Sequence, residues 1–230
     1  MIRSVGCLKL VFLVTILLLV GRANSDPSLC ANETLLFESH LFKNGSLIYS
    51  DEFNGALDRD HWLPRTKTWK VKEGMLIGSP DYKDAVEAQK ALGRDHHLGL
   101  SPVIRLDDLP SKFVLHLRLK FEGKNFETGR PKFDIGHHIN TLCFNAEGYT
   151  LKLHDGQVFV GKAPGVKLNQ WIDVVLEFQP GGCWISVNGE GQLVKNAQVS
   201  MQGRSELTFK TFANAPNRIM FDSIKLWQAE

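Results

Sequence analysis

The densest group of side chains that could do chemistry lies in the segment 132–139, KFDIGHHI. Asp134, His137 and His138 fall within five residues of one another there. A histidine near a carboxylate can act as a base, bind a metal ion or simply form hydrogen bonds. If the segment is a strand, Asp134 and His138 share one face and His137 takes the other. Asp134 and His138 are therefore candidate catalytic residues. The alternative is a polar strand face whose hydrogen bonds are all satisfied.

A binding groove for a polar ligand is the second hypothesis for this region. His116 and Arg118 would lie on one face of a neighbouring strand and extend the group. Trp184 alternates with polar residues, which makes it the best candidate for an exposed aromatic platform under a sugar ring. The predicted ligand-binding residues are His116, Arg118, Asp134, His138 and Trp184. The remaining fold-defining tryptophans, Trp62, Trp69 and Trp227, are expected in the core.

Another pair of carboxylates, Asp173 and Glu177, would share a face of the strand that follows Trp171. Four residues at roughly 3.3 Å each place them about 13 Å apart. A retaining glycoside hydrolase needs its two carboxyl groups about 5–5.5 Å apart. This pair therefore does not predict hydrolysis.

The elements that must position these groups are predicted to be strands. Apolar residues alternate with polar ones along 113–121 and 171–178, and helix-length periodicity is missing. Four residue pairs that suit tight turns separate later segments: Glu147-Gly148, Asp155-Gly156, Gly181-Gly182 and Asn188-Gly189. The second half should thus be an antiparallel meander, covered by a second sheet from strands before residue 121 and after residue 205. The expected fold class is all-β, an antiparallel two-sheet sandwich.

Residues 1–25 are predicted to be a signal peptide. Arg3 and Lys9 supply positive charge, an apolar run extends from Leu10 to Val20, and small residues follow at 23–25. The run is about half of the roughly 20 residues that a spanning helix requires. We expect cleavage, a secreted or periplasmic protein and no remaining membrane span. A retained anchor is the alternative.

Cleavage would also change the charge of the working protein. It removes three of the 27 basic residues and none of the 25 acidic ones, so the net charge falls from +2 to −1. No basic run remains, which argues against nucleic-acid binding. Residues 26–46 are predicted to be a spacer with a helical turn around 33–42. Asn32 and Asn44 begin glycosylation acceptor sequences, which matter only in a source cell that glycosylates.

Three cysteines remain after the predicted cleavage: Cys30, Cys143 and Cys183. Cys143 and Cys183 both lie in strand-like segments. They could form a disulfide, or each could be a small buried thiol, and the sequence leaves both open. No Cys-x-x-Cys pair is present, so a structural zinc site is not expected.

The order of several motifs resembles the concanavalin A-like lectin and glucanase superfamily. The segment YSDEFNGALD at 49–58, followed by Trp62, resembles the opening strand of laminarinase-type family 16 glycoside hydrolases. WKVKEGML at 69–76 resembles their next strand pair, and RIMFDSIKLW at 218–227 their closing strand. The segment 171–189 is similar to laminin-G-like and secreted 3-keto-disaccharide hydrolase domains. The resemblance implies a jelly-roll domain over 47–230.

This resemblance also carries expectations about the site. Family 16 hydrolases have a Glu-x-Asp-x-Glu-type signature on one strand, whereas the nearest central strand here, 132–139, holds a single acid. Several members of the superfamily hold a structural Ca²⁺ near the first and last strands. The matching positions make Asp222 and the backbone carbonyl of Gly74 candidate calcium ligands. The alternative is a hydrogen-bonded surface aspartate at 222.

The sequence thus favours an exported, lectin-like domain that binds carbohydrate or another extracellular polar ligand. The first alternative is a glycoside hydrolase or polysaccharide lyase, with His138 as base and Arg118 neutralising a uronate. The second is a structural or adhesive module without a small ligand. These functions follow from a resemblance of fold, and fold alone does not determine function. The ligand and the oligomeric state are left open.

Overall fold

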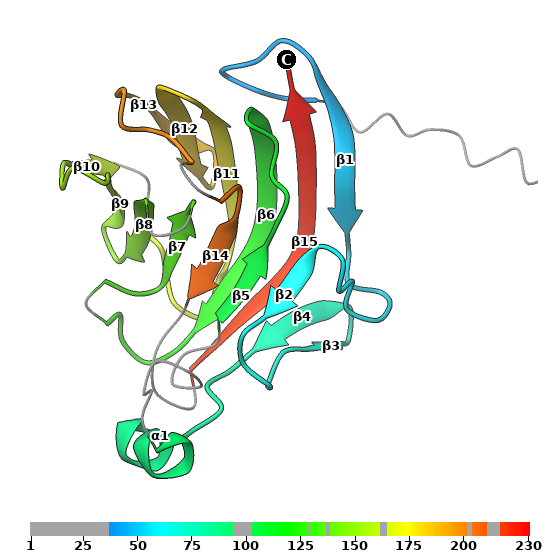
Figure 1. The fold of residues 1–230 in the computed structure, drawn as a ribbon, viewed down its shortest axis with the longest axis vertical. Helices are drawn as coiled ribbons and strands as arrows, with labels where there is room; N and C mark the ends of the chain where they lie inside the picture. Colours follow the sequence, from blue (N-terminus) through cyan, green and yellow to red (C-terminus); the bar gives the residue numbers. More distant parts are fainter. Residues whose placement is uncertain are drawn as a thin grey trace, which may run out of the picture. The chain divides into compact units, whose positions relative to one another are not determined.

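The computed structural model describes residues 37–93, 103–127, 129–136, 139–161, 165–201, 204–210 and 217–230. In these ranges the chain forms two antiparallel sheets and one short helix, so the all-β two-sheet prediction is confirmed (Figure 1). The described residues all belong to one compact unit.

Sheet A contains eight described strands. In spatial order it runs β13 (Glu190–Lys195), β12 (Gly182–Val187), β11 (Trp171–Gln179), β6 (Phe113–Glu122), β15 (Arg218–Ala229), β4 (Met75–Gly78) and β3 (Lys70–Lys72), with β1 (Gly45–Asp51) also paired to β15. Sheet B contains seven described strands. It runs β10 (Val158–Gly161), β9 (Gly148–Lys152), β8 (Asn140–Asn145), β7 (Lys132–Ile135), β14 (Leu207–Lys210), β5 (Val103–Leu106) and β2 (Trp62–Pro64).

All four predicted turn pairs join neighbouring antiparallel strands. At the β12–β13 turn, Asn188 and Gly189 have φ of 51° and 84°, the left-handed geometry that a two-residue hairpin requires. The predicted single meander is wrong, however. β8–β10 belong to sheet B, whereas β11–β13 belong to sheet A. The chain changes sheet between Gly161 and Trp171, so each sheet takes strands from both halves of the sequence.

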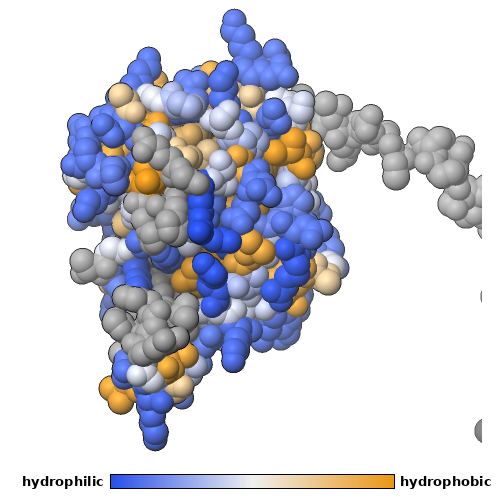
Figure 2. All heavy atoms as spheres, in the orientation of Figure 1, coloured by the Kyte–Doolittle hydropathy of each residue, from blue (hydrophilic) through white to orange (hydrophobic). Residues whose placement is uncertain are grey.

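The inner faces of the two sheets share one apolar core. Phe209 of sheet B, Phe221 of sheet A and Trp62 of β2 have ring centroids 5.2–5.7 Å from one another. Trp62 and Trp69 belong to this core, as predicted, whereas Trp227 is buried on the outer side of sheet A, where its ring contacts those of His116 and Phe37. On the face seen in Figure 2, apolar side chains lie in patches between hydrophilic ones. Because the apolar members of the alternating strands fill the core, the polar members face outward, and a site on the sheet surfaces must be built from them.

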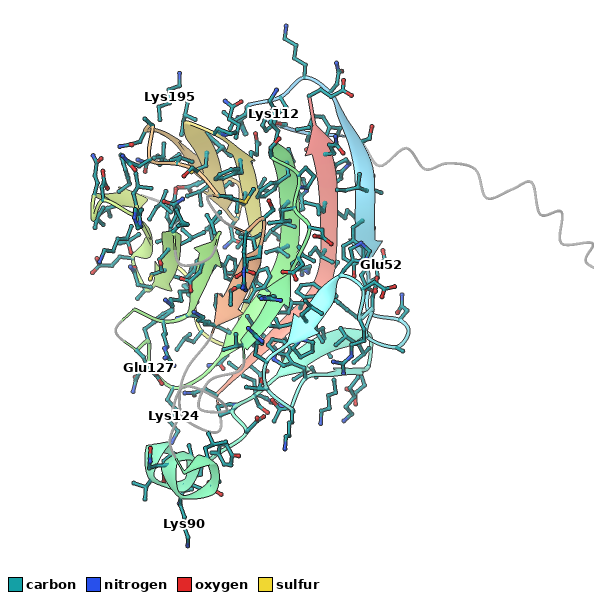
Figure 3. All side chains as sticks on the ribbon, in the orientation of Figure 1. Glu52, Lys90, Lys112, Lys124, Glu127 and Lys195 are labelled. Carbon is teal, nitrogen blue, oxygen red and sulfur yellow. The ribbon has the colours of Figure 1, made fainter. Side chains whose placement is uncertain are left out.

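The helix α1 (Ala85–Leu92) was not predicted, although its end signals are present in the sequence. The Asp84 carboxylate accepts hydrogen bonds from the N–H groups of Val86 and Glu87, and Gly93 ends the helix with φ of 75°. Lys90 extends from α1 away from the sheets (Figure 3). Within the described ranges, no helix is long and apolar enough to cross a membrane.

Cys143 and Cys183 are both free thiols, so the disulfide alternative is not realised. Cys183 is part of the core, and burial raises its pKa to about 12. Cys143 lies on β8 and points to the other side of sheet B, where burial also raises its pKa. The thiols lie on different sheets and face different ways.

Candidate functional site

The centre of sheet B presents charged side chains on its outer face. On β7, Phe133 and Ile135 belong to the core, so the alternating residues Lys132 and Asp134 face outward. The register places Thr208 of β14 on one side of Asp134 and Thr141 of β8 on the other. We call this outer surface of β5, β14, β7 and β8 the sheet B face.

Asp134 is the focus of the sheet B face. It is only 1% exposed, and its carboxylate contacts Lys210, Lys132 and Thr141. Lys210 Nζ lies 2.6 Å from Oδ2, Lys132 Nζ lies 3.1 Å from Oδ1, and Thr141 Oγ1 donates a hydrogen bond of 3.0 Å to Oδ1. Burial on its own would raise the pKa of Asp134, but the two lysines outweigh burial and hold the pKa below its usual value. Asp134 therefore stays ionised at neutral pH and cannot supply a proton as a general acid.

A second charged group continues the sheet B face toward β5. Arg105, opposite Thr208, contacts the buried carboxylate of Glu206 at 3.2 Å and the carboxylate of Asp107 at 3.1 Å. With Arg204 they line a depression of about 480 Å³. Burial raises the pKa of Asp107, Arg105 opposes this, and Glu206 adds to it. One guanidinium thus holds two carboxylates, of which one is easier to protonate than usual.

The outer surface of sheet A carries the other predicted residues. His116 and Arg118 lie on β6, where Leu115, Leu117 and Leu119 face the core. Arg118 contacts the carboxylates of Asp173 at 3.1 Å and Asp222 at 3.4 Å, and all three side chains are substantially exposed. Its guanidinium also lies 5.9 Å from the ring centroid of Trp171. Arg118 is therefore already paired within its own sheet.

The N-terminal segment 37–42, which we call the strap, covers another part of the sheet A surface. The predicted helical turn is absent from this described part of the spacer. Glu177, 1% exposed, accepts hydrogen bonds of 2.7–2.8 Å from Ser39 Oγ and from the N–H groups of His40 and Leu41. The strap is thus fixed by the carboxylate of a residue more than 130 positions away.

Trp184 is not the open platform that the sequence suggested. His40 of the strap stacks on it, with ring centroids 4.0 Å apart and an interplanar angle of 23°. A Cβ atom at Gly191 would collide with the indole, so the neighbouring strand also contacts the ring closely. Trp184 is half-buried between these two contacts and cannot offer a free face to a sugar.

The described residues do not form the single groove that the sequence predicted. Asp134 faces outward from sheet B, whereas His116, Arg118 and Trp184 face outward from sheet A, on the opposite side of the shared core. His138 lies outside the described residues, as does His137. The structure does bring His116 and Trp184 together, because both line one cavity under the strap.

The two candidate calcium ligands, Asp222 and the Gly74 carbonyl, stay a prediction. The Asp222 carboxylate is paired with Arg118, and Gly74 lies in the turn between β3 and β4 with φ of 68°. Within the described ranges, no group of three His, Cys, Asp or Glu side chains could hold a metal ion. In this structure the Asp222 side chain thus forms a surface ion pair with Arg118.

Comparison with known proteins identifies the fold. No family model matches the chain, and no curated protein matches it. Among solved structures, a non-specific endo-β-1,3(4)-glucanase of family GH16 has a TM-score of 0.58 at 13% identity, over 84% of this chain and 95% of that one. The chain has the jelly-roll fold of family GH16.

Two further structures give the same result. The endo-β-1,3-glucanase of Pyrococcus furiosus has a TM-score of 0.53 at 14% identity, over 81% of this chain and 95% of that one. A structure from work on endo-acting O-glycanases of human gut microbiota has a TM-score of 0.54 at 14% identity, over 81% and 91%. At such identity the family GH16 likeness establishes the fold alone.

The side chains of β7 that face outward are Lys132 and Asp134, and the next alternate residue along the chain is Gly136. Asp134 is the one acid among these three residues.

Sequence reasoning missed most of the charged partners on the sheet B face. Lys132 could have been found, because it alternates with Asp134 on the same strand. Lys210 and Arg105 could not, since their place beside β7 depends on how β14 and β5 pair across the sheet. Glu206 directly precedes β14, and no pattern in the sequence marks it as buried.

Proposed function

We propose that the protein is an exported carbohydrate-binding protein, and that the glycan binds on the sheet B face. The fold supports this, because the similar solved structures are glucanases and O-glycanases that act on glycans. The polar surface supports it too, since charged and hydroxyl side chains lie side by side on β5, β14, β7 and β8 and can hydrogen-bond sugar hydroxyls.

The observation that carries the proposal is the cluster of the buried Asp134 with the partly exposed Lys132 and Lys210. Removing a carboxylate from water is costly, and an ion pair in such a place often contributes little net stability compared with apolar packing. Such a cluster at the centre of a sheet is more readily explained by a ligand that uses it. The lysine ammonium groups are donors, and the Asp134 carboxylate orients them.

The cluster favours binding over hydrolysis. Asp134 stays ionised, and its strand offers no second outward carboxylate in the described residues 132–136. A hydrolase of the two-carboxylate kind needs a proton donor as well as an ionised partner. Binding without cleavage requires only donors and acceptors in fixed positions, and the cluster supplies them.

Isothermal titration with laminarin oligosaccharides and with mucin O-glycans tests the proposal. Lys210→Met keeps the stem but removes the ammonium group, and we expect at least about tenfold weaker binding from the lost charged hydrogen bond. Lys120→Met on sheet A is the matched control. Lys120 is 18% exposed and paired with Glu122 at 2.8 Å, close to the 17% exposure and 2.6 Å pairing of Lys210.

The control variant should bind like the wild type. Equal loss of binding in both variants would mean that the effect is general, and the sheet B face would no longer be the site. No binding of either glycan class by the wild-type protein would contradict a carbohydrate ligand of these kinds.

Hydrolysis is the second candidate, and the Arg105 depression is the observation that favours it. Burial raises the pKa of Asp107, and Asp107 shares Arg105 with the carboxylate of Glu206, so a carboxyl group that is easier to protonate lies near a second carboxyl group in one depression. Reducing-sugar release from laminarin by the wild type, and its loss in Asp107→Asn, would support hydrolysis. Binding without product release would support the lectin-like function instead.

A further inference from the structure

Three lysines come together on the outer surface of sheet B. Lys210 of β14 lies directly opposite Lys132 of β7 in the strand register. In the next row, Lys152 of β9 lies beside Thr141 of β8, which in turn lies beside Asp134 of β7. We call Lys132, Lys152 and Lys210 the lysine triad. On the outer side of these four described strands, Asp134 is the one acid.

Lys132 and Lys210 share a single compensating charge. Like charges directly opposite each other on neighbouring strands repel. The Asp134 carboxylate contacts both ammonium groups, at 3.1 Å and 2.6 Å, but its one negative charge balances only one of them. Each ammonium group has three N–H donors, and the two side chains are 23% and 17% exposed. The pair therefore keeps positive charge and donors that a ligand can reach.

Lys152 adds a second uncompensated charge. Its side chain is exposed, and no acidic side chain among the described residues forms an ion pair with it. The thiol of Cys143, opposite Lys132, lies close to both lysines, because the charges of Lys132 and Lys152 each favour its thiolate while burial raises its pKa overall. Three lysines and the Asp134 carboxylate thus leave a net charge of +2 on this part of the sheet.

The depression beside β5 has the opposite balance of charge. Arg105 and Arg204 line it together with three carboxylates, those of Asp107, Asp108 and Glu206. Arg105 already contacts two of these carboxylates, so it has no spare charge for a ligand. An acidic group would be repelled there and attracted at the lysine triad. Charge therefore determines where on this surface an anion can bind.

We propose that the glycan on the sheet B face is anionic, and that its acidic group, a sulfate ester or a carboxylate, binds at the lysine triad. This rests on the proposed function, because it names the class of glycan for the same surface. Lys132 and Lys210 donate to the acidic group from the side away from Asp134, and Lys152 donates from β9. Hydrogen bonds between ionised partners are short and strong. Lysine is a point charge and accepts either acidic group.

Isothermal titration with matched glycan pairs tests the charge of the ligand. One pair is laminarin oligosaccharides and their sulfated derivatives, and the other is tetragalacturonate methyl ester and free tetragalacturonate. In at least one pair the anionic member should bind about tenfold tighter or more. Raising NaCl from about 50 mM to about 500 mM should reduce this advantage, because salt screens charges. The pair with the larger ratio identifies the acidic group as sulfate or carboxylate.

Lys152→Met tests the place of binding. It should weaken binding of the preferred anionic glycan by about fivefold, the upper range for an exposed ion pair, and lower the ratio of anionic to neutral binding. Lys70→Met is the matched control. Lys70 of β3 in sheet A is likewise exposed, and no described acidic side chain forms an ion pair with it. This variant has the same change in net charge and should bind like the wild type.

The outcomes separate this proposal from the proposed function. Equal binding of both members in each pair, with Lys210→Met weakening all of them, would refute the anionic ligand and leave the glycan site intact. No binding of any glycan, neutral or charged, would refute the proposed function itself. Equal losses in Lys152→Met and Lys70→Met would overturn the assignment to the lysine triad. So would binding of duplex DNA as tight as that of the anionic glycan, since the surface would then recognise any polyanion.

Discussion

Asp134 and Glu177 are two carboxylates buried to the same degree, one on the outer surface of each sheet, and they are stabilised in different ways. Asp134 is paired with two lysines from its own strand and from a neighbouring strand. Glu177 is held by a serine hydroxyl and two backbone N–H groups from the strap. The first arrangement is a charged cluster within a sheet. The second uses a carboxylate to fix a distant segment.

The difference has consequences for function. The Asp134 cluster keeps cations and hydroxyl groups on the sheet B face, where they can contact a large ligand. The Glu177 carboxylate instead accepts hydrogen bonds from the strap. The strap covers Trp184 and leaves a small cavity beneath it. The outer surface of sheet B therefore leaves a row of charged and hydroxyl groups open to a ligand, whereas part of the outer surface of sheet A is covered by the strap.

Asp134→Ala should have the largest effect on stability. It leaves two lysines without their shared carboxylate in a part of the molecule where they are mostly buried. Breaking a buried charge pair costs about 3–5 kcal/mol, so we expect a loss near the lower end, since both lysine stems can move toward water. Urea unfolding gives the free energy of unfolding directly.

Thr141→Val is the control for this prediction, because it removes only one hydrogen bond from Asp134 and should cost about 1 kcal/mol. A similar loss in the two variants would show that the lysine pairs contribute little, and that the contrast with Glu177 is overstated.

Glu177→Gln should have the second largest effect, about 2 kcal/mol, because a neutral amide replaces a charged acceptor of three hydrogen bonds. The loss should be local to the strap. Hydrogen exchange at the amides of His40 and Leu41 should accelerate, while amides of β7 and β14 stay protected.

Asp173→Asn tests whether position on β11 alone explains that result. Asp173 shares the outer side of β11 with Glu177 but is exposed. Strap exchange should not change in this variant. Faster exchange there would mean that the strap responds to β11 as a whole and not to the Glu177 carboxylate.

The sequence predicted what depends on local physics. Alternation along 113–121 and 171–178 predicted β6 and β11 and which of their residues face outward, because side chains of a strand alternate by geometry. The turn pairs predicted four hairpins because glycine and asparagine tolerate the positive φ that tight turns require. The outward direction of Asp134, His116, Arg118 and Trp184 could therefore be predicted from the chain alone.

The sequence could not say which sheet each strand joins. An outward polar residue of sheet A has the same pattern as one of sheet B, so His116 and Asp134 were expected in one groove although they lie on opposite sides of the core. Nor could it predict that His40 covers Trp184, since that contact joins residues far apart in sequence through an irregular segment. Lys210 was missed because its contact with Asp134 arises from strand pairing.

The pH dependence of stability should separate the two surfaces. The pKa of His116 is lowered in the folded state by burial, so below its ordinary value of about 6.5 the unfolded chain binds more protons. Stability should therefore fall as the pH drops from 7 toward 5. The pKa of Asp134 is also lowered, so its contribution is complete above about 4 and is lost only below that.

Urea unfolding at pH 7, 6, 5 and 3.5 measures both windows. His116→Phe should remove the part of the decline between pH 7 and 5 that His116 causes, and leave the decline below pH 4 unchanged. Glu177 and Glu38 favour the protonated ring of His116 and Lys225 opposes it, so the effect should be smaller than that of either carboxylate variant. If the free energy of unfolding fell as steeply between pH 7 and 5 in His116→Phe as in the wild type, His116 would not be a cause of this decline.

Arg118→Gln should have the smallest effect, below about 0.5 kcal/mol, even though Arg118 contacts two carboxylates. Its side chain and both partners are exposed to water, which weakens the attraction and makes ordering the side chains costly. The contrast with Asp134 lies in burial, since both residues have two oppositely charged partners. Urea unfolding at low and at high salt measures the difference. A loss as large as that of Asp134→Ala would show that the number of ion pairs, and not their burial, determines what each surface contributes.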